Sequence, residues 1–184
     1  VLFYVPQYLQ KAGELSAFES GLGLLPFMAV FALTSFVAGP LYNRIGGRII
    51  VTLGGAGIAL GPLLISFGVK ESGSIGGIIP GLVILGIGVG LFYSSATTIG
   101  VTAVDPSRSS LAGGIIYMFQ IAGGSVGLAL TTTLFASASG LISGLHVAFR
   151  FNAIAAAVGF LIILFGVGPR GRPAGEQAGQ TTGA

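Results

Sequence analysis

Long apolar stretches, separated by a few short polar segments, run through most of the chain. The number of residues between successive charged residues indicates how many membrane-spanning helices fit, because a helix that crosses a bilayer needs about 20 mostly apolar residues. Between Glu19 and Arg44 lie 24 uncharged residues, and between Arg48 and Lys70 there are 21. Each of these two gaps has room for one membrane-spanning helix.

The rest of the chain adds three further spans. The gap from Glu71 to Asp105 holds one span after its Gly-Ser opening, and the gap from Arg108 to Arg150 holds one span that ends in a small-residue stretch. The five predicted spans cover residues 20–40, 49–69, 76–102, 109–136 and 149–168. The predicted fold class is an all-α polytopic membrane protein, with a membrane helical bundle over residues 1–168.

The two ends of the chain differ from the spans. Residues 1–10 are apolar and aromatic but too short to cross a bilayer, and the sequence has neither an initiator Met nor the features of a signal peptide. We interpret them as the end of a sixth helix, so the sequence is expected to be a fragment. Residues 169–184 are rich in Gly, Gln and Thr and are expected to form a disordered tail.

The composition fits a protein embedded in lipid. Hydrophobic residues make up 53% of the 184 residues and charged residues only 7%, against roughly 25% charged residues in a soluble domain. This composition excludes a cytosolic enzyme and a nucleic-acid binder. The absence of Cys excludes disulfides and cysteine metal sites.

Basic residues are distributed unevenly between the two ends of the predicted bundle. One end would hold five basic against two acidic residues, namely Arg44, Arg48, Arg108, Arg170 and Arg172 against Asp105 and Glu176. The other end would hold three basic and three acidic residues. Because positively charged loops stay in the cytoplasm, the first end and the C-terminal tail are expected to be cytoplasmic.

Glycines four residues apart recur in the predicted spans. The pairs are Gly57/Gly61, Gly77/Gly81, Gly86/Gly90 and Gly123/Gly127. Lipid gives apolar helices no hydrophobic reason to associate, so the close packing of small residues has to hold them together. Such faces suit a bundle that rocks between two conformations, and they equally suit any dense bundle.

The spans carry none of the residue groups that an enzyme needs. No Asp, Glu, Lys or Arg lies in the middle of a predicted span, and the sequence has no nucleophile with a base and no cluster of metal ligands. Catalytic residues, metal ligands and cofactors are therefore not expected. The single histidine, His146, falls in a predicted loop, where we expect a solvated or interfacial role.

Polar and aromatic side chains within two spans are candidates for a transport pathway. Tyr93 and Thr97 share one face of a helix, and so do Tyr117 and Gln120. The amide of Gln120 cannot remain unpaired against lipid, so it should face the bundle or a cavity. These four side chains can line a pore for amphipathic organic compounds. Alternatively, each of them serves in hydrogen bonding between helices.

The segment between the first two spans resembles the cytoplasmic signature loop of the major facilitator superfamily, Gly-x-Leu-x-Asp-Arg-x-Gly-Arg-Arg. The matching residues are Gly39, Leu41, Arg44, Gly46 and Arg48, and Asn43 stands in place of the family's acidic residue. The resemblance implies that Gly39, Asn43, Arg44, Gly46 and Arg48 form a cytoplasmic gate loop, with Asp105 and Arg108 as a supporting pair. Asn43 can form hydrogen bonds but brings no charge to this gate.

Four further segments are similar to the C-terminal half of fourteen-helix drug:proton antiporters of that family. They are residues 3–10, 20–26, 108–114 and 120–129, in the family's order and spacing. The resemblance implies five complete helices plus the end of a sixth, with an N-terminal half of the same chain that is missing here. It also implies a bacterial inner membrane as the location, and alternating access around a midplane site.

The function expected from this resemblance is proton-coupled efflux of hydrophobic or cationic organic compounds. The expected partners are a small organic substrate, protons and the lipid bilayer. One alternative keeps the fold and changes the cargo to a metabolite or sugar. Another alternative is a non-transporting membrane subunit that packs against other proteins.

Overall fold

The computed structural model describes residues 1–70 and 73–166, and this part of the chain contains helices and no strand. The helices are α1 (Tyr4–Lys11), α2 (Ala17–Leu22), α3 (Leu25–Ile45), α4 (Gly47–Gly68), α5 (Ile75–Thr102), the short 3-10 helix η1 (Pro106–Arg108), α6 (Ser109–Ala136) and α7 (Leu141–Gly166). Five segments are long and apolar enough to cross a membrane. The predicted fold class, an all-α polytopic membrane protein, is confirmed.

The helix limits agree with most of the predicted spans. The predictions 76–102 and 109–136 correspond to α5 and α6, and the prediction 49–69 corresponds to α4. The first span, predicted at 20–40, is divided between α2 and α3. The predicted end of the last span, at 168, and the tail 169–184 lie outside the described residues.

The last helix begins much earlier than the charge pattern indicates. α7 starts at Leu141, not near residue 149, so His146 lies within a helix and the prediction of a loop there is wrong. Arg150 also lies inside α7, where it is exposed. A long, flexible arginine side chain can carry its charge away from the apolar surroundings of its own backbone, so one arginine does not end a helix.

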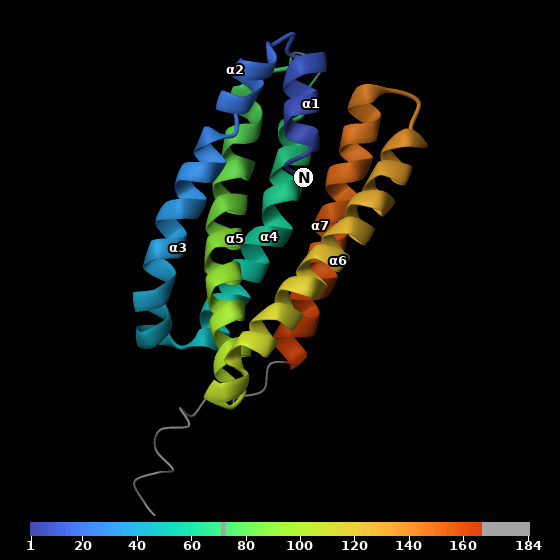
Figure 1. Ribbon diagram of the computed structural model, residues 1–184. Coiled ribbons are helices and arrows are strands. Elements are labelled where there is room, and N and C mark those ends of the chain that lie inside the picture. Colours follow the sequence, from blue (N-terminus) through green and yellow to red (C-terminus); the bar gives the residue numbers. More distant parts are fainter. Residues whose placement is uncertain (71–72, 167–184) are drawn as a thin grey trace, which may run out of the picture.

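The antiparallel helices α4 and α5 form the most closely packed part of the bundle, and they lie side by side along their lengths (Figure 1). A Cβ atom on Gly57 would lie 2.7 Å from Cα of Gly88, and one on Gly61 would lie 2.7 Å from Cβ of Leu85. Side chains at these glycines would collide with the facing helix. Glycine is therefore what allows α4 and α5 to approach so closely.

A second face of α5 packs against α3. A Cβ atom on Gly86 would lie 2.9 Å from the carbonyl oxygen of Phe27, and one on Gly90 would lie 2.9 Å from Cβ of Thr34. The Gly86/Gly90 pair thus serves the α3–α5 contact in the way that Gly57 and Gly61 serve the α4–α5 contact. α5 is the central helix of this group.

α6 is attached differently. It runs obliquely to α5 and packs alongside α7 (Figure 1). Gly100 of α5 faces Ile116 of α6 near the joint between these two helices. In contrast, a Cβ atom on Gly123 or Gly127 would have nothing within 4 Å in the described part of the chain. The fourth predicted glycine pair therefore makes no helix contact here.

The predicted gate loop is reduced to one residue, Gly46. α3 continues to Ile45 and α4 begins at Gly47, with Gly46 at φ +84° between them. Residues that have a Cβ atom rarely adopt this backbone conformation. A glycine is therefore needed where one residue joins two helices. The α3–α4 junction, the α5–α6 turn and the C-terminal end of α7 lie at the same end of the bundle, the lower end in Figure 1.

Candidate functional site

A groove of about 670 Å³ lies between α3 and α5 on the side of the α3–α4 junction. From α3 it is lined by Ala38, Gly39, Pro40, Tyr42 and Asn43, and from α5 by Ser94, Ser95, Thr98 and Thr102. We refer to it as the α3/α5 groove. Its volume falls within the range of about 300–1,000 Å³ that is usual for small-molecule sites.

Ser95 lies in the wall of this groove with an unpaired hydroxyl group. Its side chain is only 1% exposed, and Oγ has no hydrogen-bond partner among the described residues. A buried polar atom without a partner costs about 1–3 kcal/mol. The neighbouring Thr98 and Thr102 instead donate to carbonyl oxygens of their own helix, at 2.8 and 2.7 Å.

The structure separates the five predicted gate residues into different environments. Gly39 and Asn43 line the α3/α5 groove, and Arg44 is exposed in the last turn of α3. Arg48, in the first turn of α4, donates through Nη2 to the carbonyl oxygen of Leu164, at 3.4 Å. A cation near the C-terminal end of a helix interacts favourably with the helix dipole, so Arg48 links α4 to the end of α7.

Asp105 and Arg108, the predicted supporting pair, flank the turn between α5 and α6. The Asp105 carboxylate accepts hydrogen bonds from the Ser107 hydroxyl, at 2.6 Å, and from the Ser107 backbone N–H, at 2.9 Å. These hydrogen bonds, the hydroxyl first, hold the pKa of the Asp105 carboxyl below its ordinary value. The backbone N–H of Arg108 donates to the carbonyl oxygen of Asp105, at 2.8 Å. The carboxylate of Asp105 thus caps a tight turn.

The four predicted pathway residues lie on the two helices that meet at the α5–α6 turn. The tyrosine rings are exposed, Tyr93 by 44% and Tyr117 by 58%, and Gln120 is half-buried. The Thr97 hydroxyl donates to the carbonyl oxygen of Tyr93, at 2.8 Å. Thr97 therefore uses its only donor within its own helix and can offer other groups its lone pairs alone.

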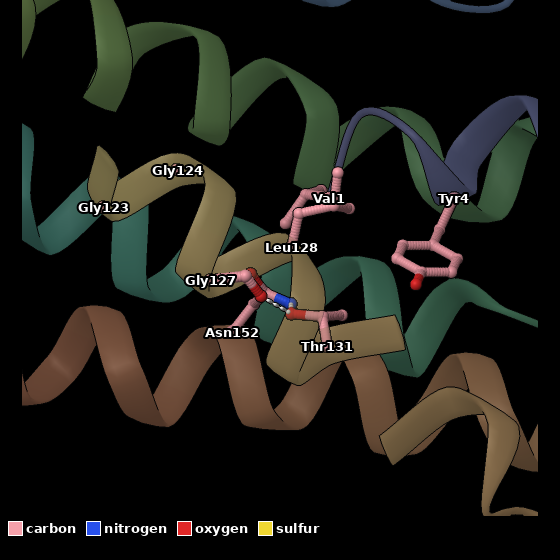
Figure 2. A pocket seen from close by; sticks show the side chains of 8 residues that line it. All are labelled: Val1, Tyr4, Gly123, Gly124, Gly127, Leu128, Thr131 and Asn152. Carbon is pink, nitrogen blue, oxygen red and sulfur yellow. Dashed lines mark hydrogen bonds between the residues drawn. The ribbon is translucent and has the colours of Figure 1, made fainter. Parts of the chain in front are cut away.

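A second, smaller cavity of about 280 Å³ lies between α1, α6 and α7 (Figure 2). Its polar residues include Asn152, whose side-chain amide points toward Thr131 and donates to Oγ1 of Thr131, at 3.1 Å. Asn152 also donates to the carbonyl oxygen of Ala148, at 2.8 Å. Just beside this cavity, the hydroxyls of Tyr4 and Thr132 are 2.8 Å apart. Three helices are thus joined by polar contacts around one cavity.

The sequence analysis missed this polar cluster, although one signal was available. Asn152 lies well within an apolar helix. Like the amide of Gln120, its side-chain amide needs a hydrogen-bond partner there, because an unpaired amide is costly in apolar surroundings. The predicted span 149–168 has Asn152 in its first turn, near the expected membrane surface, and so the residue does not stand out. The earlier start of α7 moves Asn152 into the bundle.

His146 belongs to a further polar contact between helices. Its Nδ1 lies 3.2 Å from Oγ of Ser66, a buried residue of α4. The solvated role expected for His146 followed from its predicted loop position, and the structure places it in the α4–α7 contact instead. The contact between Ser66 and His146 could not be deduced from the sequence, because α4 and α7 are distant along the chain.

Comparisons with known proteins give a consistent result. Residues 1–183 match the family model described as Major Facilitator Superfamily. The multidrug resistance protein Stp of Mycobacterium tuberculosis is 31% identical over 137 residues, which is 74% of this chain and 25% of that protein. The drug efflux pump JefA of the same species is 28% identical, over 74% of this chain and 26% of that protein.

A fungal protein is similar to the same extent. The dehydrocurvularin exporter of Alternaria cinerariae is 32% identical over 145 residues, which is 74% of this chain and 24% of that protein. The chain therefore spans about a quarter of the length of the curated relatives it matches.

Proposed function

The chain belongs to the Major Facilitator Superfamily of membrane transporters, and on this premise we propose that it is part of a secondary transporter that exports hydrophobic or cationic organic compounds in exchange for protons. In this proposal the chain supplies the C-terminal half of the bundle, and an N-terminal half of the same polypeptide supplies the coupling carboxylate. The two halves rock around a midplane site in a bacterial inner membrane, with the tail in the cytoplasm.

The observation that carries the proposal is the similarity to proteins named as a multidrug resistance protein, a drug efflux pump and an exporter, at 28–32% identity. The composition of the spans also favours apolar cargo. Polar residues are few in the middle of the helices, whereas a sugar or a polar metabolite needs many hydrogen-bonding partners. Export is therefore preferred to uptake of such a metabolite.

Specific roles follow for the residues on α5 and α6. We assign Tyr93, Thr97, Tyr117 and Gln120 to the wall of the pathway, where exposed tyrosine rings can stack on flat or cationic compounds. The half-buried amide of Gln120 would hydrogen-bond a donor or acceptor on the cargo.

The gate is assigned to the end of the bundle where α3 meets α4. Asn43 and Arg44 would contact the other half of the transporter when this end closes, with Gly39, Gly46 and Arg48 shaping the junction. The Asp105–Arg108 turn supports it from the neighbouring α5–α6 connection.

The experiment is transport by the full-length protein in everted membrane vesicles, with ethidium and tetraphenylphosphonium as probes. Both are organic cations, but only ethidium has N–H donors. Efflux of both should require a pH gradient and stop when an uncoupler collapses it. Gln120→Leu should lower ethidium efflux about 3- to 10-fold relative to tetraphenylphosphonium, as expected for the loss of one hydrogen bond.

Ser125→Ala is the matched control, because Ser125 is exposed on α6 and its hydroxyl donates only to the carbonyl oxygen of Ile121 in its own helix. Its probe ratio should equal that of the unmodified protein. An unchanged ratio in Gln120→Leu would remove Gln120 from the pathway. Absence of efflux for both probes, with uptake of a sugar or metabolite instead, would refute the export proposal. A protein that moves no compound would support a packing subunit.

A further inference from the structure

The α3/α5 groove contains one buried hydroxyl group, that of Ser95, with no hydrogen-bond partner in the described part of the chain. On α5, the hydroxyls of Thr97, Thr98 and Thr102 each donate to a carbonyl oxygen one turn earlier in the helix. Ser95 has a similar carbonyl one turn back, yet its Oγ has no partner and the side chain is 1% exposed. The three threonine hydroxyls are thus satisfied locally, whereas the buried Ser95 hydroxyl has no partner among the described residues and lies at the wall of the groove.

Several groups that line the groove offer lone pairs to a ligand. The hydroxyl hydrogens of Thr98 and Thr102 are used within α5, so these two residues offer lone pairs to the groove. Ser95 can accept as well as donate, and the amide of Asn43 supplies a carbonyl oxygen together with two N–H donors. A ligand with an N–H or O–H group can therefore donate to the lone pairs of Ser95, Thr98 and Thr102.

The groove also carries no charge. None of its lining residues is Asp, Glu, Lys, Arg or His, and the position where the family's signature has an acid is occupied by Asn43. An ion that enters would lose its hydration without gaining an opposite charge, which is unfavourable. Ala38, Pro40 and the ring of Tyr42 offer apolar contacts beside the hydroxyls. A neutral molecule with an apolar body and one donor fits this combination.

We propose that the α3/α5 groove binds neutral organic molecules through an N–H or O–H group that is donated to Oγ of Ser95. This inference rests on the proposed function and refines it, because it adds neutral hydrogen-bond donors to the compounds handled and assigns them a site apart from the pathway face of Tyr93 and Thr97. Ser95 is the residue that selects for the donor.

The test uses full-length transporter, with any other cysteine replaced, and two matched neutral probes. N-phenyl-1-naphthylamine has one N–H, and its N-methyl derivative has the same aromatic body without that donor. Ser94→Cys places a thiol in the groove lining beside Ser95, and Ser125→Cys places one on exposed α6. The rate of labelling by N-ethylmaleimide reports whether a probe covers the thiol.

N-phenyl-1-naphthylamine should slow the labelling of Ser94→Cys severalfold, whereas the N-methyl derivative should not, and neither should affect Ser125→Cys. Adding Ser95→Ala should raise the concentration of N-phenyl-1-naphthylamine needed for protection about 3- to 10-fold. Because the hydroxyl has no partner among the described residues, and a buried unpaired polar atom is destabilising, Ser95→Ala should not lower the melting temperature and is expected to raise it.

Equal protection by both probes, or protection that does not depend on Ser95, would overturn the proposal. A lower melting temperature for Ser95→Ala would also overturn it, since Ser95 would then bond to another segment of the transporter that occupies the groove. Ethidium efflux by the same preparations separates the two proposals. Efflux without protection removes only the groove site, and absence of efflux removes the export function.

Discussion

α5 and α6 have the same length and are both rich in glycine, but they are packed very differently. Both are described as 28-residue helices, and both are rich in glycine. In α5, 44% of the most apolar stretch is buried, and a Cβ atom added to Gly81, Gly86, Gly88 or Gly90 would collide with α3 or α4. In the segment that contains α6, none of the corresponding stretch is buried, and Gly114, Gly123, Gly124 and Gly127 face open space within the described residues.

The difference shows that glycines four residues apart do not by themselves predict a helix contact. Whether they make one depends on the helix that lies beside them. On α5 the glycines hold two helices at close distance, so they contribute to stability directly. On α6, Gly123, Gly124 and Gly127 make no such close contact and instead border the cavity between α1, α6 and α7. The same residue type therefore leaves open space beside α6 and closes the space beside α5.

The largest expected effect is at the α4–α5 contact. In Gly88→Ala, the new Cβ would lie 2.5 Å from the backbone nitrogen of Ile58 and 2.6 Å from the carbonyl carbon of Gly57. Backbone atoms cannot move aside as a flexible side chain can, so we expect a loss of about 2–3 kcal/mol in the free energy of unfolding. Thermal unfolding of the purified transporter in detergent measures it.

The matched control for that change is Gly114→Ala on α6, where a Cβ would meet nothing within 4 Å. Alanine has a higher helix propensity than glycine, so stability should be unchanged or slightly raised. Equal destabilisation by both variants would break the comparison, because it would mean that the α6 face is packed as tightly as α5 in the complete protein.

A smaller effect is expected at the polar contact between α6 and α7. Asn152→Ala and Thr131→Val each remove one side of the 3.1 Å hydrogen bond between Asn152 Nδ2 and Thr131 Oγ1. A double-mutant cycle of unfolding free energies should give a coupling of about 0.6–1.7 kcal/mol, as is usual for hydrogen bonds between membrane helices.

Ser125→Ala in place of Thr131→Val is the control for this cycle, since Ser125 bonds only within α6. It should show no coupling to Asn152. A coupling near zero for the Asn152–Thr131 pair itself would mean that α6 is held to α7 by apolar packing alone.

The smallest effect is expected at the exposed turn that joins α5 to α6. Hydrogen bonds from Ser107 lower the pKa of Asp105 in the folded protein, so the cap is present at neutral pH and is lost as the pH falls through this lowered pKa. Below about pH 4, the amides of Ser107 and Arg108 should lose protection from hydrogen exchange, measured relative to intrinsic rates.

Asp105→Asn is the matched control for the turn. An asparagine oxygen can still accept from Ser107 but does not titrate in this range, so protection of the turn should not change with pH. The same loss of protection in this variant would show that Asp105 is not the titrating cap. In that case, another titrating group would control the pH dependence of the turn between α5 and α6.

The candidate site could be predicted only in part. The resemblance to the signature loop singled out Gly39 and Asn43, and the structure brings these two residues together with Ser95 and Thr98 in one groove. Helical spacing predicts that Tyr93 and Thr97 share a face, but it does not single out Ser95. Spacing identifies which residues share a face, but it cannot show which hydroxyl will lack a partner, because that depends on neighbouring atoms.

Ser95, Asn152 and His146 illustrate why the remainder required coordinates. The partners of Asn152 and His146 belong to other helices, Thr131 on α6 and Ser66 on α4. The isolation of Ser95 is likewise a property of the packing around it. No sequence periodicity carries information on such contacts between distant segments.

The apolar pattern of the chain was enough to predict a bundle of membrane-spanning helices and the limits of α5 and α6 nearly to the residue. This was possible because the length of a span follows from bilayer thickness and the cost of burying charge, which act locally along the chain. The tertiary structure alone decided that Arg150 stays within a helix, that the α5 glycines are packed while those of α6 are open, and that one serine hydroxyl faces a groove without a partner. These features depend on which helices meet, and that is settled by shape and hydrogen bonding between segments far apart in the chain.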